Sequence, residues 1–115
     1  MDQIRRKRVE ETLKAEIAAL LAKGDVKDPR VDSFLSITRV ELARDGSHAK
    51  LHVSTFKGSD ALKEAVNGLN AAAGFIQSAI AKRLHIRLTP KLVFMADEGI
   101  REGFELGEKI KDLFQ

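Results

Sequence analysis

His48, His52 and His85 are the side chains best suited to hold a metal ion, because the chain contains no cysteine. His48 and His52 stand four residues apart on a segment in which polar and apolar residues alternate, and an extended chain holds such positions too far apart to share one ion easily. None of the histidines belongs to a His-Glu-x-x-His pattern. We therefore expect no metal site and no other cofactor.

Patterns that support catalysis are equally scarce. The sequence contains no Gly-x-Ser-x-Gly turn, no phosphate-binding glycine loop and no dinucleotide-binding fingerprint. Its acidic residues are spread over several helical segments, so no pair of carboxylates can be nominated for acid–base chemistry. We expect a protein that is not an enzyme and has no catalytic residues.

Clustered cations are the chemistry that the sequence does provide. The formal net charge is only +3, so the grouping of the basic residues is more informative than their sum. One group opens the chain, a second surrounds the end of a central helical segment, and two more lie on one face of an alternating segment. The candidate contacts to a polyanion are Arg5, Arg6, Lys7, Arg8, Lys50, His52, Lys82, Arg83, Arg87 and Lys91. A solvated charged surface explains the same residues more plainly, and both interpretations stay open.

Length and composition bound the class of protein. A chain of 115 residues, 43% hydrophobic and 32% charged, fits one globular domain over residues 1–115. No apolar run approaches the ~20 residues of a membrane span, and the basic start is not followed by the apolar stretch of a signal peptide. We expect a cytoplasmic protein without a membrane partner. Its only aromatic residues are six phenylalanines, which predicts no exposed platform for stacking.

The elements that must position the cations begin with a helix and a pair of strands. Apolar residues recur on one face at helical spacing in the first segment, and strict alternation after residue 47 predicts a strand. Between them, Leu35 and Ile37 have one parity and Val40 and Leu42 the other, so we expect a bulge or sharp twist near residues 38–39. The predicted elements are a helix over residues 4–22, a strand over residues 35–43, a hairpin turn at residues 44–47 and a strand over residues 48–56.

The central stretch, from Leu62 to Arg87, carries an apolar stripe at spacings of three and four residues that is typical of a helix. Periodicity alone allows one long helix with a tolerated glycine. Gly74 lies near the middle, however, and a glycine in a helix interior costs about 1 kcal/mol relative to alanine. We favour two helices that meet at a kink formed by Ala72, Ala73 and Gly74, and the single long helix stays the alternative.

The last part of the chain predicts a strand and a helix. The short apolar run from Leu92 to Met95 is typical of a strand buried on both faces. A helical connection joins it to the preceding strand, so the two strands should be parallel neighbours. A final helix is expected from Asp97 onward. The whole pattern predicts an α+β fold of order α-β-β-α-α-β with an additional C-terminal helix, in which helices cover one face of a three-stranded sheet.

Several short strings, spread over nearly the whole chain, form a recognisable series. They are Arg5-x-x-Arg8-Val9, Lys27-Asp28-Pro29-Arg30, Arg44-Asp45 followed by Ala49-Lys50-Leu51-x-Val53, Ala72-Ala73-Gly74-Phe75-Ile76, and Arg87-x-x-Pro90-x-Leu92-x-Phe94. Each string alone is a weak signal. In this order and spacing, they resemble the bacterial ribosome-binding factor A family.

The resemblance implies a type II KH-like domain in which the kink at residues 72–74 replaces the usual Gly-x-x-Gly loop. It implies a non-catalytic assembly factor that binds the 30S subunit and 16S ribosomal RNA, supports late 16S maturation and is linked to growth in the cold. Basic side chains would then hold RNA phosphates. Gln77 departs from the family, whose members often carry a basic residue there.

Two further expectations concern partners. We expect a monomer. The alternative to an RNA-binding factor is a protein-interaction module without direct RNA contact, which would dock through exposed apolar residues between Phe104 and Phe114.

Overall fold

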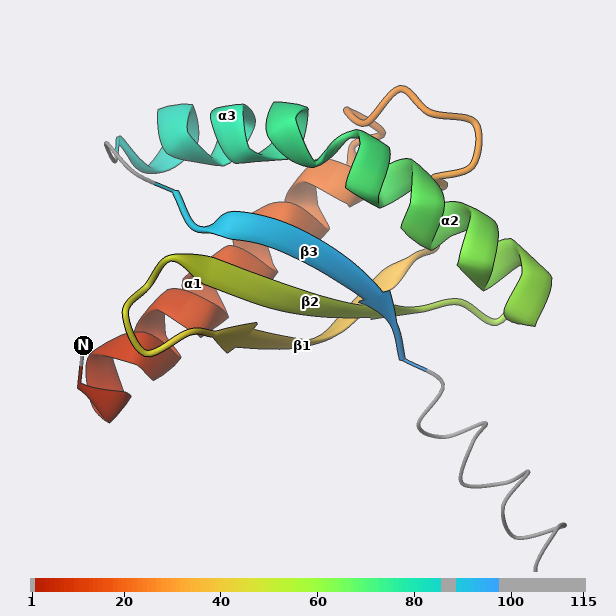
Figure 1. Ribbon diagram of the computed structural model, residues 1–115. Coiled ribbons are helices and arrows are strands. Elements are labelled where there is room, and N and C mark those ends of the chain that lie inside the picture. The colour runs from red at the N-terminus through yellow and green to blue at the C-terminus, as the bar shows by residue number, and fades with distance from the viewer. Residues whose placement is uncertain (1, 86–88, 98–115) are drawn as a thin grey trace, which may run out of the picture.

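The computed structural model describes residues 2–85 and 89–97, and its helices and strands follow the predicted order (Figure 1). The elements are α1 (Gln3–Ala22), β1 (Ser36–Leu42), β2 (His48–Ser54), α2 (Ser59–Ala71), α3 (Ala73–Leu84) and β3 (Lys91–Ala96). Asp97, the expected first residue of the final helix, donates its backbone N–H to the Val53 carbonyl (2.7 Å) and so continues the hydrogen bonding of β3. The rest of that helix, the segment from Phe104 to Phe114 and Arg87 lie outside the described residues.

The three strands form one sheet in the order β1-β2-β3. β1 and β2 are antiparallel, and β2 and β3 are parallel, as the helical connection between them predicts. The register of β1 shifts between Ile37 and Arg39, which confirms the expected bulge. The extra residue, Thr38, lets the apolar residues on both sides of it face the same way, and Ile37 and Val40 are both buried.

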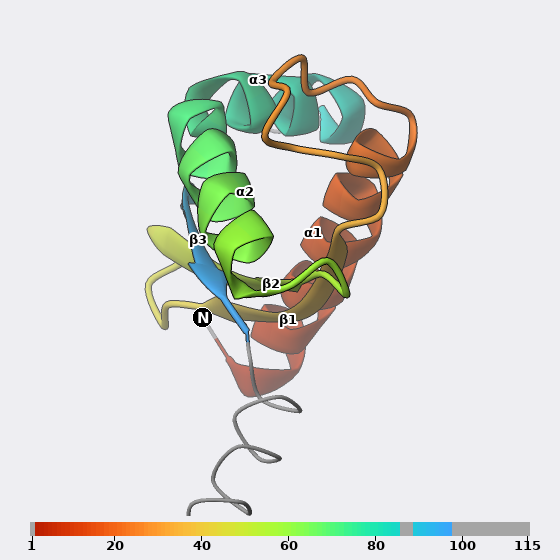
Figure 2. The same cartoon turned by 90° about the vertical axis from the view of Figure 1, so that its right-hand side faces the viewer.

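Helices α1, α2 and α3 cover one face of this sheet and leave the other face open (Figure 2). Ala49, Leu51 and Val53 of β2 point toward the helices and are fully buried. The intervening Lys50 is exposed and His52 is half-buried, because both lie on the open face. The α+β fold with helices on one side of the sheet is therefore confirmed.

Burial of β3 on both faces is a prediction that the structure contradicts. Leu92 and Phe94 are buried against the helices, but Val93 and Met95 are 38% and 39% exposed. Alternate residues of β3 face the open side of the sheet, which no helix of the described part covers. A short apolar run therefore predicted the strand correctly but did not distinguish a strand buried on one face from a strand buried on two.

α1 begins and ends where its local chemistry predicts. The Asp2 carboxylate caps the start by accepting a hydrogen bond from the Arg5 backbone N–H (2.8 Å), and this bond lowers the pKa of the carboxyl. The same negative charge offsets the basic residues that stand at the positive end of the helix dipole. At the other end, Gly24 adopts a φ of +71° and its N–H bonds to the Leu21 carbonyl (3.0 Å).

The central stretch forms two helices rather than one, which confirms the kinked alternative. The break is at Ala72, whose φ of −93° and ψ of 4° lie outside helical geometry. Gly74 lies within α3, and a Cβ at this position would meet nothing within 4 Å. Gly68 of α2 is the crowded glycine instead, because its Cβ would stand 2.9 Å from Val31 Cγ2. Close packing therefore requires the glycine at 68 and does not require the glycine at 74.

Candidate functional site

The predicted basic residues come from distant parts of the chain and lie toward one end of the molecule, where the start of α1 and the end of α3 stand at opposite heights in both views (Figures 1 and 2). The start of α1, the turn between β1 and β2, the start of β3 and the end of α3 all lie toward the left-hand end of Figure 1. Residues 5–8 occupy the first turns of α1, Lys82 and Arg83 occupy the last turn of α3, and Lys91 begins β3. We call these residues the basic end.

The open face of the sheet continues this positive charge. His48 pairs with Lys91 across β2 and β3, and Lys50 pairs with Val93 in the same register. Because residues 48, 50 and 52 of β2 share one parity, their side chains project from the open face together with those of Lys91 and Val93. Two lysines and an apolar patch therefore stand on the side of the sheet that the helices leave uncovered.

The predicted contact residues differ in whether they have a partner within the protein. Arg83 Nε lies 2.6 Å from Glu16 Oε2, so this guanidinium joins α3 to α1. His52 Nε2 lies 3.3 Å from Glu41 Oε1 without forming a hydrogen bond, and its side chain is only 20% exposed. The ion pairs found in residues 2–85 and 89–97 engage none of the remaining described candidates, which are Arg5, Arg6, Lys7, Arg8, Lys50, Lys82 and Lys91.

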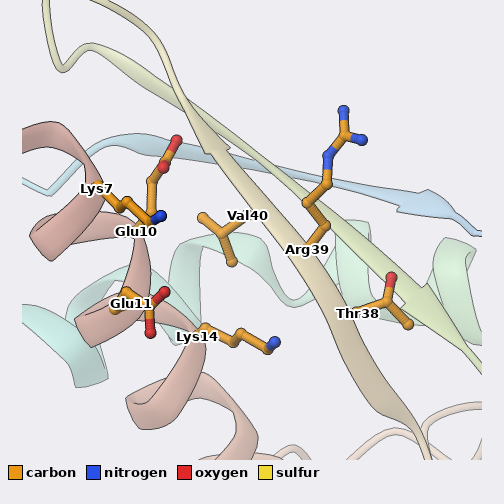
Figure 3. Close-up of a pocket in the computed structure, with 7 residues that line it drawn as sticks. All are labelled: Lys7, Glu10, Glu11, Lys14, Thr38, Arg39 and Val40. Carbon is orange, nitrogen blue, oxygen red and sulfur yellow. The ribbon is translucent and has the colours of Figure 1, made fainter. Parts of the chain in front are cut away.

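A charged groove separates α1 from the edge strand β1 (Figure 3). Its volume is about 250 Å³, and it is lined by Lys7, Glu10, Glu11, Lys14, Thr38, Arg39 and Val40. Glu10 Oε2 accepts a hydrogen bond from the Leu42 backbone N–H (2.7 Å), which satisfies a backbone group on this free edge of the sheet. Cations and carboxylates both line the groove, so it does not favour a polyanion.

Side-chain amides attach the two central helices to the other free edge of the sheet. Asn70 of α2 accepts a hydrogen bond from the Phe94 N–H (2.8 Å) and donates one to the Phe94 carbonyl (3.0 Å). Gln77 of α3 accepts one from the Leu92 N–H (3.1 Å). The two amides lie on either side of the break at Ala72, so both helices are held on one strand. Sequence reasoning missed this role, because the helical period relates positions within one helix and the break at Ala72 lies between the two amides.

The turn at residues 27–30 packs against α2 at Gly68. Arg30 Nε and Nη2 donate to the Asp28 carboxylate at 3.0 and 2.8 Å, and the Arg30 backbone N–H donates to it at 2.9 Å. These bonds lower the pKa of Asp28 to about 2, because they stabilise the ionised carboxylate. A Cβ on Gly68 would stand 3.2 Å from both Arg30 Cβ and Asp28 Oδ1, which explains how closely the turn approaches the helix.

The three histidines lie apart from one another. His48 Nδ1 is 2.8 Å from Ser47 Oγ at the start of β2, His52 stands beside Glu41, and His85 follows the end of α3 with a φ of 54°. Among the described residues, no group of three His, Cys, Asp or Glu side chains could hold a metal ion. None of the helices in the same part of the chain combines the length and the apolar character that a membrane span needs.

Comparison with known proteins settles the family. A model of the ribosome-binding factor A family matches residues 5–110. The chain belongs to the ribosome-binding factor A family. Ribosome-binding factor A of Treponema denticola is 42% identical over 113 residues, which are 98% of this chain and 86% of that relative.

Solved structures of ribosome-binding factor A proteins share the fold. The solution NMR structure of a Thermotoga maritima protein assigned to this family aligns with a TM-score of 0.72 at 31% identity, and covers 86% of this chain and 92% of that one. A homology model of Thermus thermophilus ribosome binding factor A, as fitted into the cryo-EM map of a 30S complex, aligns with a TM-score of 0.63 at 27% identity. That alignment covers 78% of this chain and 92% of the other.

Proposed function

We propose that this chain binds the 30S ribosomal subunit by contacting 16S ribosomal RNA with its basic end, and that it supports late 16S maturation without catalysing a reaction. The observation that carries the proposal is that cations from α1, α3 and β3 all lie toward one end of the molecule. Membership of the ribosome-binding factor A family supports it, since a relative has been fitted into a 30S complex. Because ribosomes assemble in the cytoplasm, we propose that location too.

The contact consists of bonds between basic side chains and RNA phosphates. Arginine can donate two parallel N–H bonds to one phosphate, whereas lysine acts as a point charge. Each contact releases counterions from the RNA, so the affinity falls steeply as salt is added. Phosphate contacts recognise the shape of folded RNA rather than its base sequence. The cations outside the ion pairs of the described residues carry this contact, namely Arg5, Arg6, Lys7, Arg8, Lys50, Lys82 and Lys91.

Three other residues are proposed to contribute less to RNA binding. Arg83 must exchange Glu16 for a phosphate, which an exposed ion pair permits at a cost of about 1 kcal/mol or less. His52 lies beside Glu41 and is mostly covered, so it offers less of its ring to RNA. Arg87 lies outside the described residues, and its RNA contact stays a prediction from the sequence.

Sedimentation with purified 30S subunits tests the binding itself. We expect the chain to co-sediment with 30S particles at low salt and to be released at high salt, because phosphate contacts release counterions. Co-sedimentation that is indifferent to salt would favour docking on a ribosomal protein and would contradict the proposal. The free chain should sediment as a monomer of 12.7 kDa, which is the oligomeric state that we propose.

Crosslinking to immature 30S particles tests which component is touched. A photo-crosslinker at position 8, in the basic end, should capture 16S RNA. The matched control carries the crosslinker at Lys63, an exposed residue of α2 outside the basic end, and should capture far less. Crosslinks from position 8 that are confined to ribosomal proteins would contradict RNA contact.

Removal of the protein from cells tests the role in maturation. Precursors of 16S ribosomal RNA should accumulate, and the wild-type chain should remove them. A chain in which Arg5, Lys7 and Arg8 are replaced by glutamine should restore maturation poorly, because it binds the particle weakly. Full restoration by that variant would contradict the assigned role of the basic end.

A further inference from the structure

Phe34 and Phe56 are exposed phenylalanines that lie side by side. Phe56 is 82% exposed and Phe34 is 60% exposed, with ring centroids 6.1 Å apart and ring planes at 64°. A phenylalanine ring stabilises a fold mainly when it is buried, because burial removes its apolar surface from water. These two rings remain exposed, so stability of the fold does not explain the pair. The low aromatic content argued against RNA stacking on an exposed aromatic platform, and the structure now shows two exposed rings in contact on which such stacking can be tested.

The register of β1 and β2 brings the two rings together. Ser36 at the start of β1 pairs with Ser54 at the end of β2. Phe34 lies two residues before Ser36, and Phe56 lies two residues after Ser54. The two chain segments therefore leave the sheet side by side. The pair therefore stands at the end of β2 opposite to the turn between β1 and β2, and away from the basic end (Figure 1).

Lys57 adds a positive charge to the ring pair. Its Nζ lies 5.3 Å from the centroid of the Phe34 ring and 2.9 Å from Asp32 Oδ2. The turns on both sides are fixed, since Asp32 Oδ1 accepts the Phe34 N–H at 2.8 Å and Thr55 Oγ1 accepts the Lys57 N–H at 3.3 Å. An exposed ion pair is worth about 1 kcal/mol or less, so the ammonium can exchange Asp32 for another anion.

We propose that Phe56, braced by Phe34, stacks an unpaired base of the ribosomal RNA, and that Lys57 contacts a phosphate beside that base. This inference rests on the proposed function and adds to it a second contact that reads an unpaired nucleotide rather than phosphates alone. Single-stranded segments are the RNA elements whose bases are free to stack on aromatic side chains. The occupant of the ring pair is therefore a nucleotide in a loop, bulge or single strand.

The charges and the spacing favour a nucleotide over an apolar side chain of a partner protein. A cation beside an open aromatic face matches the phosphate and the base of one nucleotide, whereas an apolar side chain gives Lys57 no new partner. The seven residues of β2 span roughly 20 Å between the basic end and the rings. An RNA held at the basic end therefore meets the rings at a high effective concentration, which strengthens the second contact.

Two substitutions of Phe56 separate base stacking from apolar docking. Phe56→Tyr keeps an aromatic ring, and Phe56→Leu keeps apolar volume without a ring. We expect the affinity for 30S subunits to stay near wild type with tyrosine and to fall roughly tenfold with leucine. The slope of log affinity against log salt should not change in either variant, because no phosphate contact is lost. Lys57→Gln should lower that slope by about 0.7–0.9.

Phe75→Leu is the matched control, because it removes a 54% exposed ring that lies on α3 outside the pair. It should bind 30S subunits like wild type, and thermal unfolding should show that all variants fold. Stacking would be overturned if Phe56→Leu bound 30S subunits with wild-type affinity, or if Phe56→Tyr lost affinity while Phe56→Leu did not. An equal loss of affinity in Phe75→Leu would overturn it too. Each of these results would leave the proposed function intact. Failure of the wild-type chain to bind 30S subunits would overturn both.

Discussion

The Asn70 amide holds α2 on the edge strand β3, and its removal gives a measurable test of how the central helices are fixed. Its side chain makes two hydrogen bonds to the backbone of Phe94, at 2.8 and 3.0 Å, on an edge that has no neighbouring strand in the sheet. Asn70→Ala deletes both bonds and leaves the N–H and the carbonyl of Phe94 without those partners.

The expected loss follows from two opposing terms. Each hydrogen bond of this kind contributes about 0.5–1.5 kcal/mol to stability, so the two together contribute about 2 kcal/mol. Alanine is the better helix former and returns roughly 0.5 kcal/mol. The free energy of unfolding should therefore fall by about 1.5 kcal/mol. A domain of about 100 residues loses about 4–8 °C in Tm for each kcal/mol, which predicts a decrease of about 8 °C.

Thermal and urea unfolding followed by far-UV circular dichroism measure this loss, and amide hydrogen exchange shows whether the Phe94 N–H loses protection. Asn67→Ala is the matched control, because Asn67 is an exposed residue of the same helix. It gains the same helix propensity without deleting the bonds to Phe94, so its Tm should stay level or rise slightly. Equal Tm values for the two variants would refute the reasoning.

Two further predictions concern glycines and a carboxyl. Gly68→Ala should destabilise by about 1–3 kcal/mol, because its Cβ would stand 2.9 Å from Val31 Cγ2, whereas Gly74→Ala should stabilise by up to about 1 kcal/mol, because its Cβ meets nothing within 4 Å. Thermal unfolding checks both, and a destabilised Gly74 variant would contradict the open space there. Arg30 lowers the pKa of Asp28 from 3.8 to about 2, so the stability that this pair contributes is complete above about pH 4 and is lost as the pH falls through about 2. NMR titration of the Asp28 carboxyl checks this, and a midpoint near 3.8 would contradict the contact.

The local pattern of apolar residues was sufficient to predict most of the helices and strands. Each element buries one face, so its apolar residues recur with the period of a helix or of a strand. The change of parity between Ile37 and Val40 predicted a bulge that the strand register confirms. The apolar stripe and its glycine predicted two central helices, although the break is at Ala72 and Gly74 lies inside α3. The apolar run from Leu92 to Met95 did not show that Val93 faces outward. A run of apolar residues shows how apolar a strand is, but not which of its faces other elements cover.

Contacts between distant segments could not be predicted in this way. The pairing of Arg83 with Glu16 joins residues 67 positions apart, so no local pattern could rank Arg83 below its basic neighbours as an RNA contact. Gln77 looked like a lost basic contact, and the structure gives its amide a backbone partner on β3. The Phe34–Phe56 pair depends on the strand register, which becomes known only when the sheet is assembled.

The central claim is that cations at the basic end bind ribosomal RNA phosphates, and the salt dependence of 30S affinity tests it most directly. Two triple variants each lower the formal net charge from +3 to 0. One carries Arg5→Gln, Lys7→Gln and Arg8→Gln in the basic end, and the control carries Lys23→Gln, Lys27→Gln and Lys63→Gln at exposed positions elsewhere. We predict that the slope of log affinity against log salt falls by about 2 in the first variant, since each lost phosphate contact removes about 0.7–0.9, and stays near wild type in the control. Equal slopes in the two variants would contradict the claim.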